Sequence, residues 1–416
     1  MRRRAVAVAL LVSLLAACDA GPGDAPPGPD GGELSGSIDV QLSGGEGEIN
    51  AARALVDAFV DAHPGTSVNL IPVPSAGDHV AKLATAFAAG NPPDVFLINY
   101  RRFGSFVRSG VIDPAPAEAA AGLYPKTVEA FTHDGRLTCL PQNASSMVVY
   151  VNPALFAKAG VPLPKPGWTW TDMLRTAMAL AGEGVEAIAF ETGLVRLAPF
   201  VWSNGGEIVD DPDDPTAVTL DAPPAREALR FLLDLQRTGL DATQRAGQEP
   251  EAAFAAGEVA MLLESRRAVP GLRKTAGLDF DVVGVPRKKS AVSVLHADGY
   301  CVSRDSENRT LAHAFARYAV STEGATVLAR TGRTVPSLQQ LAESPVFLDP
   351  TAAPRSSKVF LDAIPTLRAM PSAPGWNEAE EVAEDILTQL FAGRLSLDAA
   401  VERIAEDTAD VLAQSG

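Results

Sequence analysis

Cysteine is rare in this chain, with 3 residues in 416. So few cysteines exclude a disulfide-dense scaffold, and no two of them have the spacing of a metal finger. Positive charge is also in the minority, since 35 lysines and arginines face 51 aspartates and glutamates and leave a net charge of −16. This balance argues against a basic surface that binds nucleic acid or anionic lipid.

Motifs of common catalytic and nucleotide-binding sites are missing as well. The sequence contains no G-x-S-x-G, G-x-x-x-x-G-K-[ST], G-x-G-x-x-G, H-E-x-x-H or C-x-x-C motif. The 5 histidines are scattered singly, and the acidic run at 210–215 lacks the glycine and the terminal glutamate of a calcium-binding EF-hand loop. We therefore expect no metal site, no cofactor and no covalent chemistry.

The first residues have the order of a secretory signal. Arginines at 2–4 precede an uncharged run at 5–17, which is too short to span a bilayer permanently. The run ends in the sequence LAAC at 15–18, which resembles the lipobox of bacterial lipoproteins, where the cysteine is acylated and becomes the mature N-terminus. We predict a signal peptide at 1–17 and a lipid on Cys18; a plain signal peptide cut nearby is the alternative.

Residues 18–37 are rich in glycine, proline and aspartate and contain little to bury. This composition is typical of a flexible tether, which here would follow the lipidated Cys18. Random-coil scaling gives it a reach of about 25 Å. We expect the folded body to begin at Ile38 and to stay near the extracytoplasmic face of the cell membrane.

From Ile38 onward, strand-like and helix-like patterns alternate, which is typical of an α/β fold with mainly parallel sheets. Residues 38–42, 68–73 and 94–98 are predicted strands, with amphipathic helices between them. Ligands of open α/β sheets bind beyond the carboxyl ends of strands, so the side chains that follow these strands are candidates for a site. Further strands are expected at 147–151 and 259–263, and helices at 153–159, 172–181 with Thr171 as N-cap, 225–240, 252–256, 378–391 and 397–412.

Several short segments form a specific set through their number, order and spacing, although each is weak alone. They are residues 59–65, 82–83, 88–95, 110–114, 134–141, 149–156, 159–161, 169–172, 254–261, 332–337, 376 and 391–394. The set resembles the extracellular solute-binding proteins of ABC importers, specifically the sugar-binding family that includes maltose-binding proteins. One departure is Val151, where the family usually has tyrosine; Tyr150 keeps the aromatic character one place earlier.

This resemblance implies an α/β fold of the two-lobed periplasmic-binding-protein type (type II), with the ligand cleft between the lobes. Carried onto this chain, the first lobe covers 38–141 plus 292–337 and the second covers 147–289 plus 340–416. The hinge segments then lie near 142–146, 290–299 and 338–339. Hinge closure suits such an arrangement, because a few extended residues absorb the rotation while both cores stay rigid.

A carbohydrate, the ligand that the resemblance implies, needs an aromatic plate for its C–H faces and planar polar groups for its hydroxyls. Trp202 and Trp376 are predicted to stack on it, with a core position as the alternative; Trp168 and Trp170 are assigned to the core. The polar contacts are expected at strand ends and hinge positions, where a solvated loop role is the alternative: Glu46, Asn99, Tyr100, Ser145, Asn204, Glu264, Ser265, His296, Asp298 and Arg333.

Pairs of arginines also follow two predicted strands, at 101–102 and 266–267. If two of these arginines converge, the ligand would carry phosphate or carboxylate, because a guanidinium fork suits such groups. A phosphorylated polyol or another anionic small solute is therefore the alternative ligand.

Two of the cysteines, Cys139 and Cys301, fall on first-lobe segments that flank the crossing strands. Neighbouring strands bring Cα atoms to about 4.5–5.5 Å, which is within disulfide range. We predict one disulfide between them; two buried free thiols are the alternative.

Together, these features predict the substrate-binding component of an ABC importer. It would be a monomer and not an enzyme, would bind no nucleic acid, and would close on a sugar that it delivers to permease subunits in the membrane. Two other classes stay open. One is a secreted enzyme that uses Glu46 and Glu264 as a carboxylate pair, and the other is a surface sensor or adhesin that kept the fold.

Overall fold

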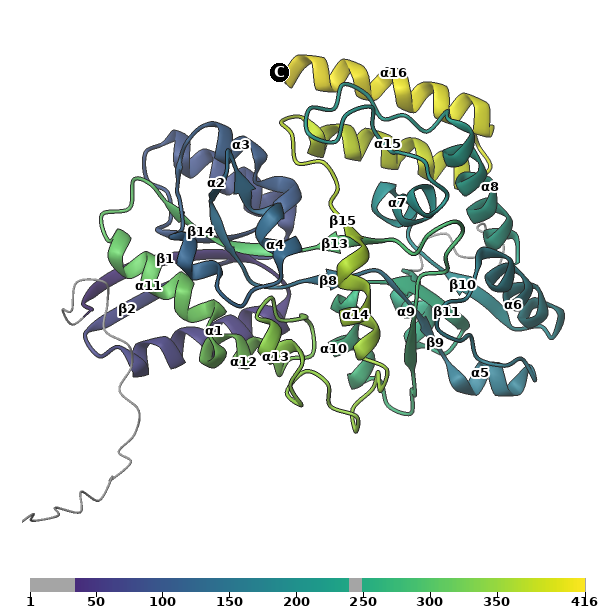
Figure 1. Ribbon diagram of the computed structural model, residues 1–416, viewed down its shortest axis with the longest axis horizontal. Coiled ribbons are helices and arrows are strands. Elements are labelled where there is room, and N and C mark those ends of the chain that lie inside the picture. Colours follow the sequence, from purple (N-terminus) through teal and green to yellow (C-terminus); the bar gives the residue numbers. More distant parts are fainter. Residues whose placement is uncertain (1–33, 239–248, 416) are drawn as a thin grey trace, which may run out of the picture. The chain divides into compact units, whose positions relative to one another are not determined.

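Two main β-sheets and a small third sheet between them organise the chain (Figure 1). The structure, a computed structural model, describes residues 34–238 and 249–415. The predicted signal peptide at 1–17, Cys18 and the tether as far as residue 33 lie outside the described residues, as do the last two residues of the helix expected at 225–240. Within the described ranges, no helix has both the length and the apolar composition for crossing a membrane.

The first sheet has the strand order β2–β1–β3–β14–β4, and β7 also pairs with β14. Its strands are β1 (Gly36–Ser43), β2 (Thr66–Val73), β3 (Val95–Asn99), β4 (Ile112–Asp113), β7 (Cys139–Pro141) and β14 (Asp298–Ser303). β1 lies parallel to β2 and β3, whereas β14 returns antiparallel. Gly36 already pairs with Thr66, so residues 36–37 belong to the sheet and not to the expected tether.

Helices cover this sheet and bury apolar side chains against it. They are α1 (Glu46–Ala62), α2 (Ala76–Ala88) and α11 (Arg309–Val320), and α12 (Thr322–Ala329) packs on α1 and α11. Phe59 of α1 and Leu83 of α2 are fully buried with Val40 and Phe96 of the strands. The shorter elements nearby are η1 (Tyr100–Arg102), α3 (Gly104–Arg108), η2 (Ala117–Ala120), α4 (Pro125–Ala130), β5 (Thr132–His133), β6 (Arg136–Leu137) and α13 (Gln339–Ala342). We call this sheet with its helices the first lobe.

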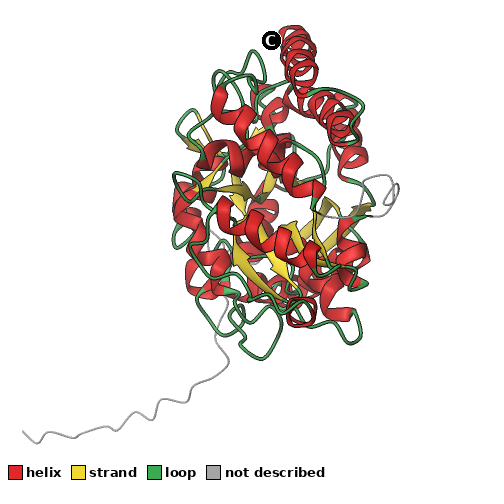
Figure 2. Ribbon diagram, turned by 90° about the vertical axis from the view of Figure 1, so that its right-hand side faces the viewer, coloured by secondary structure: helices red, strands yellow, loops and turns green. Residues whose placement is uncertain are grey.

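The second sheet has the order β10–β11–β9–β12, with β10 parallel to β11 and β9 antiparallel to both of its neighbours. Its strands are β9 (Val148–Val151), β10 (Glu186–Ala189), β11 (Val259–Glu264) and β12 (Asp281–Gly284). Around it lie α5 (Pro153–Lys158), α6 (Trp170–Gly182), α7 (Leu194–Ser203), α8 (Pro223–Arg237), α9 (Pro250–Ala255), η3 (Arg266–Ala268) and α10 (Val269–Lys274). Figure 2 shows helices on both sides of the strands, as expected for an α/β fold.

The start of α6 differs from the prediction. Its N-cap is Thr169 and not Thr171, because the Thr169 hydroxyl oxygen accepts a 3.2 Å hydrogen bond from the Asp172 backbone N–H. Asp172 in turn accepts from the Thr169 backbone N–H at 2.9 Å, which completes a capping box.

The chain ends in two helices that lie side by side, α15 (Trp376–Phe391) and α16 (Leu397–Ser415) (Figure 1). α15 also packs against α7, so both helices join the second sheet and its helices to form the second lobe. α14 (Lys358–Ala363) packs against β12 of the second sheet, and η4 (Ile364–Thr366) follows it directly.

A three-stranded sheet, β15–β13–β8, joins the lobes. Its strands are β8 (Ser145–Ser146), β13 (Ser293–His296) and β15 (Leu367–Arg368). The third crossing strand therefore lies at 367–368, whereas the sequence predicts that hinge at 338–339 and the start of the second lobe at 340. The reason is that Leu341 of α13 packs with Ala325 and Ala329 of α12, which ties this segment to the first lobe.

A disulfide joins Cys139 of β7 to Cys301 of β14, the pairing expected from the sequence. The two residues are register partners in an antiparallel strand pair, and their Cα atoms are 4.4 Å apart. The bond ties together the two strands that lead into the crossing sheet.

Candidate functional site

Charged side chains from four separate segments meet beside β13. They are Arg101 of η1, Glu191 and Arg196 at the start of α7, Glu264 and Arg267 at the end of β11, and Glu380 of α15. The elements explain this convergence, because three of the segments begin where a β-strand ends and α15 packs across α7 and η1. We call these six residues the ion network.

Glu264 is the centre of the network and its side chain is only 4% exposed. Its Oε2 accepts hydrogen bonds from Nη2 of Arg196 at 2.6 Å and from Nη2 of Arg267 at 2.8 Å. Both arginines also bind Glu191, at 2.5 and 2.9 Å. Burial raises the pKa of Glu264, but the two guanidinium groups and the Ser265 backbone N–H outweigh it and lower the pKa to about 2.

A second ion pair connects the two lobes. Nη1 of Arg101, in the first lobe, lies 2.6 and 2.7 Å from the two carboxylate oxygens of Glu380 on α15. Both side chains are mostly buried, with 16% and 7% of their surface exposed. A charge-assisted bond in such surroundings is stronger than one at the surface, so this pair contributes to holding the lobes together.

His296 stands next to both parts of the network, on the crossing strand β13 opposite Ser145 of β8. Burial, followed by the charges of Arg101 and Arg196, lowers the pKa of His296 to about 3. The opposing effect of Glu264 is smaller. The imidazole is therefore neutral at pH 7. Its Nε2 atom is buried and has no hydrogen-bond partner within the described part of the chain.

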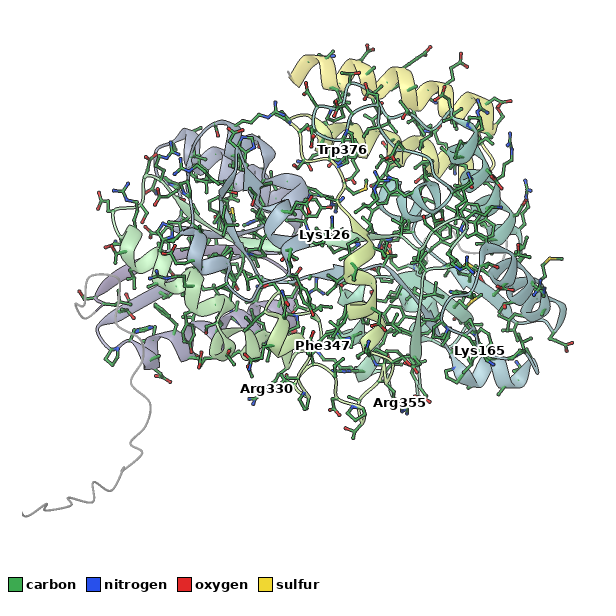
Figure 3. The ribbon with its side chains drawn as sticks, viewed as in Figure 1. Lys126, Lys165, Arg330, Phe347, Arg355 and Trp376 are labelled. Atoms are coloured by element: carbon green, nitrogen blue, oxygen red, sulfur yellow. A yellow bond between two sulfur atoms is a disulfide. The ribbon has the colours of Figure 1, made fainter. Side chains whose placement is uncertain are left out.

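Other polar atoms around the network also lack partners among residues 34–238 and 249–415. They are Nε of Arg196 and Nε1 of Trp376, the first residue of α15 (Figure 3). Trp376, Glu380 and Glu384 follow at spacings of four residues and therefore share one face of α15. We call the ion network together with His296, Trp376 and Glu384 the interlobe site.

Glu384 lies against the backbone of Gly193, immediately before α7. A Cβ atom at position 193 would come within 2.7 Å of its Oε1 atom, so any larger residue there would displace the Glu384 carboxylate. Burial and then the like charge of Glu380 raise the pKa of Glu384 to about 7.

Among the predicted site residues, Glu264 and His296 belong to this site, and Ser145 and Ser265 border it. Ser145 accepts a 3.4 Å hydrogen bond from the Arg266 backbone N–H, and Tyr150 donates a 2.7 Å hydrogen bond to the Ser265 carbonyl. These contacts hold the end of β11 against the crossing strand β8.

Three further predicted residues hold the hinge. Asp298 accepts hydrogen bonds from Nδ2 of Asn99 at 3.1 Å and Nδ2 of Asn143 at 2.9 Å. The Tyr100 hydroxyl donates to the Leu295 carbonyl and accepts from the Met370 backbone N–H. Because Tyr100 is 1% exposed, it acts as a core residue that connects β3 to two crossing segments.

The remaining first-lobe candidates lie apart from the network. Glu46, the first residue of α1, is exposed. Arg333 pairs with Glu48 at 2.7 Å and donates a 3.3 Å hydrogen bond to the Arg267 carbonyl, so it contacts the network only through backbone.

The predicted stacking roles of Trp202 and Trp376 do not agree with their positions, because protein encloses both rings. Trp202 is 4% exposed and the Arg368 guanidinium lies 4.7 Å from its ring centroid. Trp376 is 0% exposed. Asn204 is also turned away, since its Nδ2 bonds Glu227 and the Pro224 carbonyl on α8.

Sequence reasoning missed Glu191, Arg196, Glu380 and Glu384, and it considered Arg101 only as an anion ligand. Two signals could have found them. Arg196 is the single charged residue in the otherwise buried helix α7, and Glu380 and Glu384 repeat at helical spacing after Trp376.

A cavity of about 600 Å³ lies nearby, lined by Leu295 of β13 but not by His296. Consecutive residues of a strand point to opposite faces, so the cavity and the interlobe site lie on different faces of β13. Tyr100, Met370 and Lys126 of α4 also line the cavity. Figure 3 labels Lys126.

Curated relatives match over much of the chain. A binding protein of Brucella abortus (strain 2308) is 23% identical over 363 residues, which are 84% of this chain and 86% of that protein. The sn-glycerol-3-phosphate-binding periplasmic protein of Pectobacterium atrosepticum is 26% identical over 262 residues, or 58% of each protein.

Solved structures share the fold over nearly the whole chain. The ABC substrate-binding protein of Listeria monocytogenes in complex with cycloalternan superposes with a TM-score of 0.80 at 22% identity, covering 92% of this chain and 99% of that one. The GacH receptor of Streptomyces glaucescens reaches 0.79 at 22% identity, covering 92% and 100%. The sequence model of the bacterial extracellular solute-binding proteins matches residues 54–355. The chain therefore belongs to this family, the solute-binding components of ABC transporters, and has its two-lobed fold and extracytoplasmic location.

Proposed function

We propose that the protein binds a mono- or oligosaccharide at the interlobe site and delivers it to an ABC permease. The observation that carries the proposal is the group of unpartnered polar atoms there. Arg196 Nε and Trp376 Nε1 can only donate hydrogen bonds, and His296 Nε2 can donate or accept one. A buried polar atom without a partner costs free energy, and a ligand rich in hydroxyl groups would supply partners to all three atoms.

The ion pairs of the network argue against an anionic solute. Arg101 and Arg267 do converge toward His296, as an anion site would require, but each already binds a carboxylate. Arg196 is likewise bound to Glu191 and Glu264. An anion would have to displace a glutamate from its arginine, whereas a hydroxyl group can bond the network without breaking an ion pair.

Similar proteins support this class and also one alternative. The Listeria structure holds cycloalternan and the Streptomyces receptor was solved with acarbose, both at 22% identity to this chain. The Pectobacterium relative is named for sn-glycerol 3-phosphate. Together with the converging arginines, that name makes a phosphorylated polyol the second candidate.

We also propose that Cys18 carries a lipid that holds a monomeric protein at the membrane, and that the protein delivers its solute unchanged. Delivery without catalysis is supported by the separate surroundings of Glu46 and Glu264, the two carboxylates that a secreted enzyme would use as a pair. Glu46 is exposed on α1, whereas Glu264 is buried and salt-bridged to two arginines. The low pKa of Glu264 makes it a poor proton donor.

Isothermal titration of the purified protein with maltotriose, cyclic and linear oligosaccharides, simple sugars and sn-glycerol 3-phosphate tests the solute class. We expect at least one carbohydrate to bind with a Kd in the micromolar range or below, and recovered sugar to be chemically unchanged by mass spectrometry. Binding of glycerol 3-phosphate alone would replace the proposal with the second candidate. Palmitate labelling of wild type and Cys18→Ser cells tests the lipid.

A further inference from the structure

Glu384 is a carboxylate at the interlobe site with no hydrogen bond or ion pair to any part of the chain that the structure describes. It shares one face of α15 with Glu380, whose carboxylate is taken by Arg101. On the opposite side it meets Gly193 and the start of α7. Its oxygens are therefore held in place by packing but are left available as acceptors.

The charges around Glu384 do not balance when it is ionised. The neighbours that face it are Glu380 on its own helix, Arg101 from η1, and Arg196 and Glu191 from the α7 side. Across the whole site, the cations Arg101, Arg196 and Arg267 are matched by Glu191, Glu264 and Glu380. His296 is neutral, so Glu384 is the surplus carboxylate.

We propose that Glu384 is a specificity-determining residue, and that the site takes a sugar with a protonated amino group in preference to the matching neutral sugar. The inference rests on the proposed function, because it concerns the same site and the same class of solute. An ammonium group beside Glu384 neutralises the surplus charge and supplies the hydrogen-bond donors that its oxygens lack. A neutral sugar can do only the second.

If an ammonium group binds beside Glu384, a proton should be released from the site. With its pKa near 7, Glu384 is mostly protonated at pH 6 in the free protein. Binding of a cationic sugar favours the ionised form, so a proton leaves the site on binding. A residue with a purely structural role would produce no such release.

The experiment compares matched sugars on the full-length protein by isothermal titration at pH 6. The probes are chitosan oligomers without acetyl groups, their N-acetylated counterparts, and the pairs glucosamine with glucose and galactosamine with galactose. The variants are Glu384→Gln, which removes the charge and keeps the shape, and Glu381→Gln, a matched control on the exposed side of α15. Titrations in two buffers of different ionisation enthalpy measure the protons released.

We expect at least one amine to bind wild type and the Glu381→Gln variant ten-fold or more tighter than its neutral partner, with proton release. In the Glu384→Gln variant we expect the ratio of the two affinities to fall to about one and the proton release to be lost. Neutral sugars that bind wild type as tightly as amines, or a preference that survives in Glu384→Gln, would overturn this inference and leave the proposed function standing. Failure of every sugar to bind, with binding of glycerol 3-phosphate, would overturn both.

Discussion

Arg266 and Arg267 are neighbours at the end of β11, yet they lie in opposite surroundings. Arg267 reaches into the ion network, where it donates to Glu264 and Glu191, and 44% of its side chain is exposed. Arg266 is 1% exposed and has no carboxylate partner among the described residues. Its guanidinium carbon lies 4.2 Å from the ring centroid of Phe347 and 5.0 Å from that of Phe360.

The difference lies in the partners of the two arginines, which are carboxylates for Arg267 and aromatic rings for Arg266. Arg266 lies beside α14, where its guanidinium stacks on Phe347 and Phe360 and donates a 3.2 Å hydrogen bond to the Ser357 hydroxyl oxygen. Burial lowers its pKa without a carboxylate to oppose the shift. We therefore assign Arg266 to stability and Arg267 to the site.

Truncating each arginine to alanine tests this assignment and has the largest expected effect. Arg266→Ala leaves a cavity between two phenylalanines and should lower the free energy of unfolding by about 4 kcal/mol. Arg267→Ala should cost less, about 2 kcal/mol, because it removes one of the two cations that pair with the buried Glu264, but it should weaken solute binding about ten-fold. Urea unfolding and isothermal titration of both variants measure the two effects. If Arg267→Ala proves the less stable variant, the comparison fails.

Removing the charge of Glu264 tests whether the network depends on its central carboxylate. Glu264→Gln keeps the shape but turns two charge-assisted hydrogen bonds into weaker ones, so we expect a loss of about 2 kcal/mol in unfolding free energy. Affinity for the solute should also fall, because Arg196 and Arg267 lose the group that orients them. The exposed Glu183→Gln, measured in parallel, should change neither quantity.

Strand ends and hinge positions were predictable because they follow from local patterns. A buried strand that stops at a polar residue points to Glu264, and His296 lies on a segment that the family resemblance marks as a crossing. The partners of Glu264 were not predictable in this way. Arg196 and Arg267 meet it only because α7 and η3 pack at the same edge of the second sheet, which is a property of the tertiary fold.

For the tryptophans, the sequence pattern could not distinguish a ligand-stacking role from a core role. Trp202 near the end of α7 and Trp376 at the start of α15 have the spacing that either a stacking plate or a core residue would show. What separates the two roles is whether another element covers the ring. Arg368 covers Trp202, and it lies on β15, a crossing strand that the sequence did not predict at this position.

Acid should lower the unfolding free energy of wild type by protonating Glu264, and this part of the pH dependence should be absent in Glu264→Gln. The pKa of Glu264 is about 2 in the folded protein and about 4.3 when unfolded, so its contribution to stability is present above pH 4.3 and is lost as pH falls toward 2. Between pH 5 and pH 3, wild type should lose about 1.5 kcal/mol more unfolding free energy than Glu264→Gln. Equal losses in urea unfolding at the two pH values would mean that the arginines do not stabilise this carboxylate.

Trp376→Phe should have the smallest effect on stability and bears directly on the interlobe site. The variant keeps an aromatic ring in the core and removes Nε1, which bonds no group in the described chain, so unfolding free energy should change by only about 1 kcal/mol, mainly from the small cavity that the indole leaves. If Nε1 donates to the solute, affinity in isothermal titration should fall several-fold while stability stays nearly constant. Trp170→Phe, whose Nε1 also lacks a partner but lies on α6, is the matched control and should leave affinity unchanged. An equal loss in both variants would mean that the effect comes from packing, and Trp376 would then belong with Arg266 among the residues of the core.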